Sequence, residues 1–336
     1  MNADNLVSFP RITIITPSYN QGRFIEETIL SVLDQNYPNL EYIIMDGGST
    51  DNTVEVIKKY ADRITYWVSE KDKGQSNAIN KGLRMATGEI INWLNSDDLL
   101  QPGSLAVIAK YFTDNPTAII VHGRIEYFGN TKNYYSVNLP LKDIETRYAA
   151  HICMPQPASF FRKKLIDEQG LLDESLHFSM DTDLFMRAGL HYSLIQVEDV
   201  IAKFRLHGDS KSVSAFSKTF LSDNKKIFSK VVATLNEKEA IEELRSIDLY
   251  EEPASLYNKT PKKFDAKKLV FYFLQHRMST LYYQGDRKEF KRLFWHLFKK
   301  HHSMLLGAPK LIIYRMAIFL PSHFLHSLTK IKDRAS

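Results

Sequence analysis

The chain has 336 residues, of which 44% are hydrophobic and 25% are charged, and its formal net charge is +5. This length suits two or three domains of ordinary size or one large domain with an appendage, and the composition excludes wholesale disorder. A single cysteine excludes an internal disulfide framework and a zinc site built from several cysteines. No run of about 18 uninterrupted apolar residues occurs, which excludes a conventional membrane-spanning helix. Residues 1–10 lack the basic and apolar segments of a signal peptide, so we expect a cytoplasmic protein.

Four strands rich in β-branched and aromatic residues are predicted in the first hundred residues. They cover residues 12–16, 41–45, 64–68 and 90–94. Between them lie helical segments, the first of which carries one apolar face from Phe24 to Leu33. Strands that start about 25 residues apart are typical of βα units in a parallel sheet covered by helices. In such a sheet, ligands bind beyond the carboxyl ends of the strands.

The later part of the chain changes character. We expect a helix near 104–112, a strand near 118–121 and, from about residue 219 onward, helices that include 225–235 and 237–244. We therefore expect two parts: an α/β domain with a mainly parallel sheet over residues 1–215, and a helical, basic C-terminal region over residues 216–336.

Charge is distributed unevenly along the chain. Residues 262–336 carry 16 Lys and Arg against 4 Asp and Glu, a net of +12, so residues 1–261 carry −7. A basic segment indicates an anionic partner, either nucleic acid or a membrane surface. Because large apolar residues share one helical face from Phe290 to Phe298, we favour an anionic membrane surface over nucleic acid. The alternative is an ordinary helical subdomain with basic exposed faces.

Polar clusters follow the four predicted strands, and we expect them to meet at one edge of the sheet. Their sequences are TPSYN (16–20), DGGSTD (46–51), EKDKGQS (70–76) and NSDD (95–98). Asp97 and Asp98 offer oxygens to a hard divalent cation, which can stabilise a diphosphate leaving group, or they cap the following helix. Gly47 and Gly48 let the backbone approach a ligand closely, or they simply form a βα turn. Neither G-x-G-x-x-G nor a P-loop motif occurs, which argues against both of those nucleotide sites.

In order and spacing, these motifs resemble the family 2 glycosyltransferases of the GT-A fold. The resemblance covers residues 10–215 and includes the blocks QPASFFR (156–162), MDTDLFMR (180–187) and FRLHGDS (204–210). It implies a GT-A-like nucleotide-sugar-binding sandwich. It also implies an inverting transfer of a sugar from a nucleotide sugar, above all a UDP-sugar, to a hydroxyl of a glycan or lipid-linked acceptor. Surface polysaccharide biosynthesis at the inner face of the cell membrane, with the enzyme bound peripherally, is the role that such enzymes suggest.

The resemblance also implies roles for individual residues. The donor-binding set comprises Thr16, Pro17, Ser18, Asn20, Asp46, Lys73, Asn80, Ser96, Asp97 and Arg205. Asp97 and His207 would hold a divalent metal, Mn²⁺ or Mg²⁺, and Asp181 would be the catalytic base. Gln156, Asp98 and Asp183 would face the acceptor or the sugar.

Two positions depart from the family's pattern. The first position of the D-x-D motif is Asn95, which lowers the anionic charge, and the family's Glu-Asp pair reads Met180-Asp181. One carboxylate beside the acceptor still suffices as the general base of an inverting transfer. Asp183 has another possible partner, Arg187, which lies at i+4 on the same helical face.

Two other functions stay open at this point. The first is a membrane-associated module that binds nucleotide sugars without turnover, which the two departures favour. The second is a nucleotidyltransferase, which shares the α/β architecture and metal use. The absence of a glycine- and arginine-rich loop after the first strand argues against it.

Overall fold

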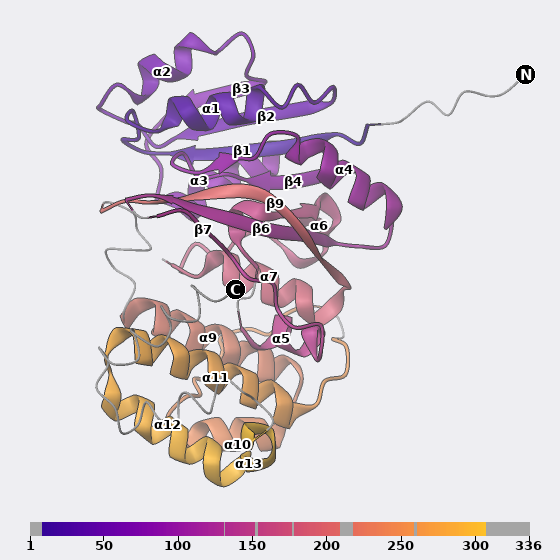
Figure 1. The fold of residues 1–336 in the computed structure, drawn as a ribbon, viewed down its shortest axis with the longest axis vertical. Coiled ribbons are helices and arrows are strands. Elements are labelled where there is room, and N and C mark those ends of the chain that lie inside the picture. Colours follow the sequence, from indigo (N-terminus) through magenta and orange to yellow (C-terminus); the bar gives the residue numbers. More distant parts are fainter. Residues whose placement is uncertain are drawn as a thin grey trace, which may run out of the picture.

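The computed structural model describes residues 9–130, 132–151, 154–176, 178–208, 218–258 and 261–306. Within these ranges one nine-stranded sheet is covered by helices, and a group of helices from the C-terminal part packs below it (Figure 1). The fold is therefore α/β followed by a helical region, as the sequence predicts. The boundary expected near residue 215 falls among residues 209–217, outside the described residues.

The sheet is parallel where the sequence predicts it and mixed elsewhere. Its order is β3 (Tyr66–Ser69), β2 (Leu40–Asp46), β1 (Ile12–Ser18), β4 (Ile90–Trp93), β8 (Ser159–Arg162), β6 (Ile120–Gly129), β9 (Leu194–Leu206) and β5 (Leu99–Leu100), with β7 (Tyr134–Tyr135) paired to β6. Strands β1 to β4 are mutually parallel, so their carboxyl ends share one edge. β8 runs antiparallel to β4 and β6, whereas β6 and β9 are parallel. The four predicted strands are confirmed, the third beginning at Tyr66 rather than at residue 64.

Two hydrophobic cores lie on the two faces of the sheet. One is formed with α1 (Ile25–Leu33), α2 (Thr53–Lys59) and α4 (Ser104–Asp114), and the other with α3 (Gln75–Met85), α6 (Lys163–Gln169) and α7 (Met180–His191). Every residue of β1 is buried, as expected for a central strand covered on both faces. α3 lies close to β1 because residue 82 is glycine: a Cβ there would lie 2.5 Å from Cγ2 of Ile15.

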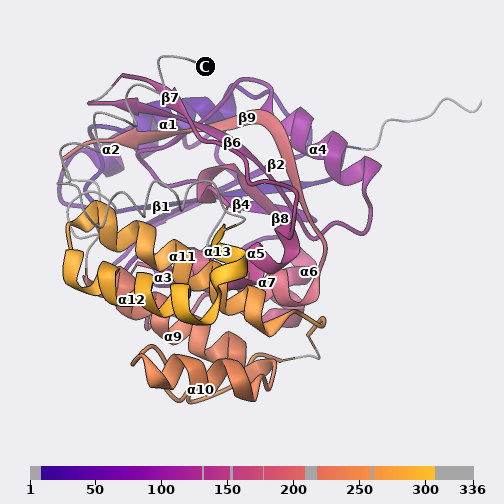
Figure 2. The same cartoon turned by 60° about the horizontal axis from the view of Figure 1, so that its bottom comes forward.

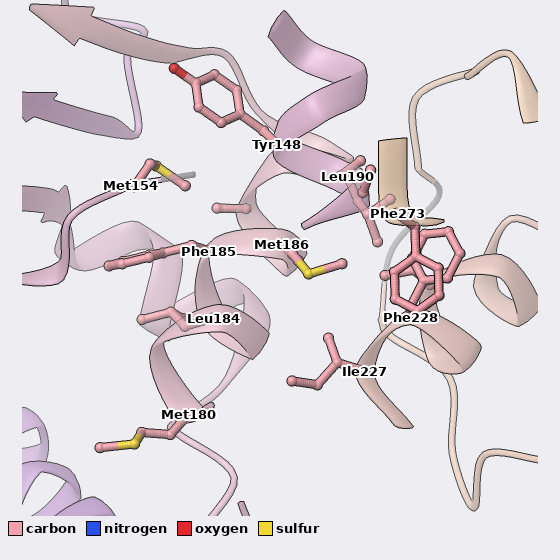
Figure 3. Close-up of a cluster of buried hydrophobic side chains, with 14 of the residues drawn as sticks. Tyr148, Met154, Met180, Leu184, Phe185, Met186, Leu190, Ile227, Phe228 and Phe273 are labelled. Atoms are coloured by element: carbon pink, nitrogen blue, oxygen red, sulfur yellow. The ribbon is translucent and has the colours of Figure 1, made fainter. Parts of the chain in front are cut away.

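The helical region shares the second core. It comprises α9 (Lys218–Thr234), α10 (Lys238–Ser246), α11 (Ala266–Gln284), α12 (Arg287–Lys300) and α13 (His302–Leu306), and α5 (Ile144–Ala150) lies between it and the sheet (Figure 2). Phe228 of α9 and Phe273 of α11 stack with their centroids 3.9 Å apart. Figure 3 shows these rings beside Leu190 of α7. The helices therefore pack directly on the α/β part through a common apolar interior.

The apolar stripe of α12 is buried inside the protein. Phe290, Leu293, Phe294 and Leu297 are each at most 3% exposed and belong to this core, where α11 packs against α12. The prediction that this stripe lies against a membrane is therefore wrong, and the alternative of an ordinary helical subdomain holds for α12. Among the helices of the described ranges, none has the length and hydropathy to span a bilayer. The rest of the basic segment, residues 307–336, lies outside the described residues.

Candidate active site

A cavity of about 660 Å³ opens at the carboxyl ends of the parallel strands. All four polar clusters predicted from the sequence contribute to its wall, together with the start of α7 and the end of β9. The lining consists of Pro17, Ser18, Tyr19, Gln21, Gly47, Gly48, Lys71, Asp72, Gly74, Gln75, Ala78, Trp93, Asn95, Ser96, Asp97, Asp98, Gln156, Phe178, Met180, Asp181, Phe204 and His207.

Asp46 shapes one wall without lining the cavity. Its buried carboxylate accepts hydrogen bonds from the Ser49 backbone N–H at 2.9 Å, from the Ser49 hydroxyl at 2.5 Å and from the Ser69 hydroxyl at 2.5 Å. These bonds fix the turn through Gly48, whose φ of +82° favours glycine. Asn20 joins this turn to the loop after β1, because its Oδ1 accepts from the Thr50 N–H at 2.9 Å. Asp46 and Asn20 therefore hold the loops that form this wall in place, although neither residue lines the cavity.

Asp97 and His207 meet at one side of the cavity. Nε2 of His207 lies 3.0 Å from Oδ2 of Asp97, and their side chains are 7% and 21% exposed. Neighbouring ligands of an octahedral ion with bonds of about 2.1 Å lie about 3.0 Å apart, which is the separation of these two atoms. Carboxylate oxygen and imidazole nitrogen both suit Mn²⁺. The two groups are hydrogen-bonded to each other, and both are of the type that holds a divalent ion. In the described residues no cluster of three His, Cys, Asp or Glu offers an all-protein metal site.

Asp98 differs from Asp97 in its surroundings. It is 1% exposed, and its Oδ1 accepts a hydrogen bond from the Arg205 backbone N–H at 3.0 Å. Burial raises the pKa of Asp98 well above its usual value, and the neighbouring charge of Asp97 raises it further. Asp98 therefore holds its proton more tightly than an exposed aspartate does.

Arg205 supports the Asp97–Asp98 turn and is absent from the cavity lining. Its Nε donates to the backbone oxygen of Asp97 at 2.9 Å, and Nη2 donates to Glu27 at 3.0 Å. The guanidinium also lies over the rings of Phe128 and Phe24, 4.4 and 5.0 Å from their centroids. The guanidinium of Arg205 is thus bound to groups of the protein itself.

Three amide side chains form a chain along another wall. Gln75 Nε2 donates to Asn95 Oδ1 at 2.8 Å, Asn95 Nδ2 donates to Gln156 Oε1 at 3.4 Å, and Gln156 Nε2 donates to the Trp93 carbonyl at 2.6 Å. Asn95, which replaces the first acidic residue of the D-x-D motif, is therefore hydrogen-bonded to amide side chains from α3 and from the turn before β8.

Asp181 and Asp183 have different environments although both lie in the first turn of α7. Asp181 lines the cavity at the helix N-terminus, where the helix dipole favours a negative charge. Asp183 is buried and does not line the cavity. Its carboxylate accepts a hydrogen bond from Tyr257 Oη at 2.7 Å and lies 2.9 Å from Arg187 Nε, a contact with the geometry of an ion pair rather than of a hydrogen bond. The i+4 pairing considered from the sequence is thus present.

The structure brings together about half of the residues proposed from the sequence. Those that line the cavity are Pro17, Ser18, Ser96, Asp97, Asp98, Gln156, Asp181 and His207. Those absent from its lining are Thr16, Asn20, Asp46, Lys73, Asn80, Asp183 and Arg205. Besides the partners already described for Asn20, Asp46, Asp183 and Arg205, Thr16 is hydrogen-bonded to the Tyr42 hydroxyl, and Asn80 donates to the Leu172 carbonyl.

Several side chains of the lining, aromatic ones among them, were not predicted from the sequence. Tyr19, which is 59% exposed, belongs to the first polar cluster, and Phe204 opens the FRLHGDS block, so their neighbours were a usable signal. Lys71 belongs to the third polar cluster, which was a signal of the same kind, whereas Phe178 carried none, because an isolated aromatic residue in a loop is common in any protein.

Comparison with known proteins identifies relatives of this chain. Residues 13–180, half of the chain, match the profile described as "Glycosyl transferase family 2". An uncharacterized glycosyltransferase of Rickettsia conorii is 31% identical over 226 residues, which cover 60% of this chain and 35% of that relative. The "Putative teichuronic acid biosynthesis glycosyltransferase TuaG" of Bacillus subtilis is 42% identical over 117 residues, 34% of this chain and 46% of the relative. The matches thus span less than half of the length of either relative.

Solved structures share the fold. TarS of S. aureus in complex with UDP-GlcNAc aligns with a TM-score of 0.60 and 16% identity over 92% of this chain and 88% of that chain. The mannosyltransferase PcManGT of Pyrobaculum calidifontis, in complex with GDP-Man and Mn²⁺, aligns with a TM-score of 0.53 and 18% identity over 97% and 81%. These likenesses show the GT-A-like fold expected from the sequence. With the profile match over half of its residues, the chain belongs to glycosyltransferase family 2.

Proposed function

We propose that this protein transfers a sugar, with inversion at the anomeric carbon, from a UDP-sugar to a hydroxyl of a glycan or lipid-linked acceptor. The observation that carries the proposal is that the Asp97–His207 pair and the carboxylate of Asp181 line the same cavity. The fold neighbour TarS, solved with UDP and with UDP-GlcNAc, supports a UDP-sugar as the donor.

The donor would lie along the loops that follow β1, β2 and β4. Pro17, Ser18 and Ser96 would contact the nucleotide, and Gly48 lets the backbone come close to it. Asp97 and His207 would hold the divalent ion, Mn²⁺ or Mg²⁺. When bound, such an ion neutralises a diphosphate and stabilises it as a leaving group. Mn²⁺ in the PcManGT complex supports this assignment.

Asp181 would act as the general base. In an inverting transfer the acceptor hydroxyl attacks the anomeric carbon from the face opposite the departing diphosphate, and its proton must be accepted as the new bond forms. One carboxylate suffices for this step. Asp183 is engaged by Arg187 and Tyr257, which leaves Asp181 as the carboxylate of α7 that lines the cavity.

The proposal also gives Gln156 a role at the acceptor side of the cavity and names the kind of product. Gln156 would face the sugar or the acceptor from the amide chain that it forms with Asn95. The name of the relative TuaG supports a role in the synthesis of a surface polysaccharide.

Peripheral attachment to the inner face of the cell membrane is part of the same proposal. Its support is the net +12 charge of residues 262–336 and the exposed Lys291, Lys299 and Lys300 on α12. Each basic residue near an anionic surface contributes about 1 kcal/mol, an effect weakened by salt. The full chain should float with anionic vesicles at low salt and less with neutral ones. Changing the three lysines to glutamate should reduce flotation, and no flotation of the full chain would contradict the attachment.

A screen of nucleotide sugars for UDP release, with Mn²⁺ and with a chelator, tests the proposed activity. The competing function is a module that binds nucleotide sugars without turnover, favoured by Asn95 and Met180 at the two altered motif positions. Binding of UDP-sugars in calorimetry, with no release of UDP in the presence of any acceptor extract, would support that module instead.

A further inference from the structure

A row of three aromatic side chains leads away from the cavity across β9, β6 and β7. Phe204 of β9 lines the cavity, Tyr127 of β6 is its register partner, and Tyr134 of β7 is the register partner of Tyr127. Residues paired in this way point to the same face of a sheet. The ring centroids of Phe204 and Tyr127 are 5.7 Å apart, and those of Tyr127 and Tyr134 are 4.5 Å apart. These three residues are called the aromatic row below.

The row is rigid at its inner end and open at its outer end. Phe204 and Tyr127 are half-buried and pack against the core on that face of the sheet. The ring of Tyr134 lies within 16° of parallel to that of Tyr127, whereas Tyr134 itself is 48% exposed. The stack therefore fixes the outer ring and leaves part of it facing solvent. Figure 1 shows the three strands running side by side.

The hydroxyl groups of the row are available for hydrogen bonding. Within the described residues, no protein group makes a hydrogen bond to Oη of Tyr127 or of Tyr134. A tyrosine presents a flat apolar face and a polar tip, and ordering it costs little conformational entropy because it has two side-chain torsions. A pyranose ring has the matching chemistry, since it carries a face of C–H groups and a rim of hydroxyls.

We propose that the aromatic row binds the sugar chain of the acceptor, one sugar ring stacking on Tyr134 while the chain's end enters the cavity past Phe204. This inference rests on the proposed function, because an acceptor hydroxyl must reach Asp181. The continuity of the row with the cavity is what favours an acceptor glycan as its occupant.

Neighbouring features argue against other occupants. β7 has two residues, so its free edge is too short for an added peptide strand. The nearby cation Arg124 lies over the ring of Tyr135, which points to the opposite face from Tyr134. The three residues of the row are themselves uncharged, whereas a groove that binds a nucleic-acid strand is lined by cations.

The test uses the full chain and a defined panel of probes: chitotetraose, cellotetraose, maltotetraose and β-1,4-mannotetraose. Saturation-transfer NMR should detect binding of at least one of them. Tyr134→Ala should weaken that binding about tenfold, the size expected for loss of a stacked ring. Tyr134→Trp should restore it. Tyr66→Ala is the matched control, because Tyr66 is a strand tyrosine with a similar exposure of 40%. It should leave sugar binding unchanged.

Three results would overturn the inference. They are failure of all four sugars to bind, equal effects of Tyr134→Ala and Tyr66→Ala, and a Tyr134→Ala variant whose defect is loss of a dimer in sedimentation or loss of vesicle binding. Calorimetry with UDP separates this inference from the proposed function. Tyr134→Ala should leave UDP affinity unchanged. A protein that binds the tetrasaccharides through Tyr134 but does not bind UDP would contradict the proposed UDP-sugar donor and support sugar binding by the aromatic row.

Discussion

Nε2 of His207 lies 3.0 Å from Oδ2 of Asp97, although two other strands separate β9 from β4 in the sheet. The short strand β5 explains why Asp97 and His207 are in contact. It follows the Asp97–Asp98 turn directly and pairs antiparallel with β9, Leu99 opposite Lys203, so the end of β9 is drawn alongside that turn. The Arg205 N–H bond to Asp98 continues the same contact. The contact between Asp97 and His207 is thus a consequence of the pairing of β5 with β9.

Asp97→Asn should abolish the effect of Mn²⁺ on UDP binding. The substitution keeps the shape but removes the anionic ligand, so the diphosphate charge is poorly compensated. Calorimetry with UDP, with and without Mn²⁺, measures this. Asp62→Asn is the control, because Asp62 is exposed and absent from the cavity lining. Unchanged metal dependence in Asp97→Asn would remove Asp97 from the site.

Asp181→Asn should separate binding from transfer. The amide is nearly isosteric but accepts a proton poorly, so UDP affinity should persist while the rate of sugar transfer falls about 10²–10⁴-fold. Transfer assays and UDP calorimetry on the same preparation measure both. Near-normal transfer by this variant would assign the base to another residue.

Local patterns predicted much of the fold and of the site. The strands and helices of residues 12–94 follow from alternation and apolar spacing, and the rule that ligands bind beyond parallel strand ends located the cavity. The Asp183–Arg187 pair follows from i+4 spacing alone. His207 lies 110 residues from Asp97, and the family resemblance alone placed the two together, because the contact depends on the β5–β9 pairing, which a two-residue strand does not reveal.

The predictions that failed depend on tertiary contacts in the same way. An apolar stripe such as that of α12 can pack against a membrane surface or against a protein interior, and the sequence of the helix alone does not distinguish the two. The motifs that contain Asp46 and Arg205 were expected beside the cavity, and both residues do contact segments that line it. Their engagement by Ser49, Ser69 and backbone groups depends on the three-dimensional course of the loops.

Arg187→Met should destabilise the protein far more than Lys110→Met, although both break an i+4 ion pair. Arg187 and Asp183 are 6% and 5% exposed, so the change leaves a buried carboxylate without its cation, at a cost of roughly 3–5 kcal/mol in the free energy of unfolding. Lys110 and Asp114 are 74% and 53% exposed, where such pairs contribute about 0–1 kcal/mol. Urea unfolding followed by circular dichroism measures both, and equal losses would refute this account of Asp183.

Glu243 should make stability dependent on acidic pH. Burial raises its pKa, but hydrogen bonds from His296 at 2.7 Å and His301 at 2.8 Å outweigh burial and lower the pKa to about 2. A carboxyl with a depressed folded-state pKa stabilises the fold above its unfolded value near 4.5 and loses that contribution as the pH falls toward 2.

The stability difference between the unsubstituted chain and Glu243→Gln should therefore be larger at pH 6 than at pH 3 in urea unfolding. Glu55→Gln, at an exposed position, is the control and should show no such trend. A difference that is independent of pH would mean that the histidine contacts do not hold Glu243 ionised.

Phe294→Ala and Trp295→Ala test the burial of the α12 stripe. Phe294 is 3% exposed within the core, and its truncation should cost about 3–5 kcal/mol in the free energy of unfolding. Trp295 is 48% exposed and should cost much less. If Phe294→Ala left stability intact while reducing vesicle flotation, the stripe would face the membrane after all.

The proposed transfer is tested most directly by incubating the full chain with a panel of UDP-sugars and acceptor extract and measuring UDP release. The account predicts release with one donor, stimulated by Mn²⁺, abolished by a chelator, and reduced about 10²–10⁴-fold by Asp181→Asn. UDP release that is unaffected by both the chelator and Asp181→Asn would contradict the roles given to Asp97, His207 and Asp181.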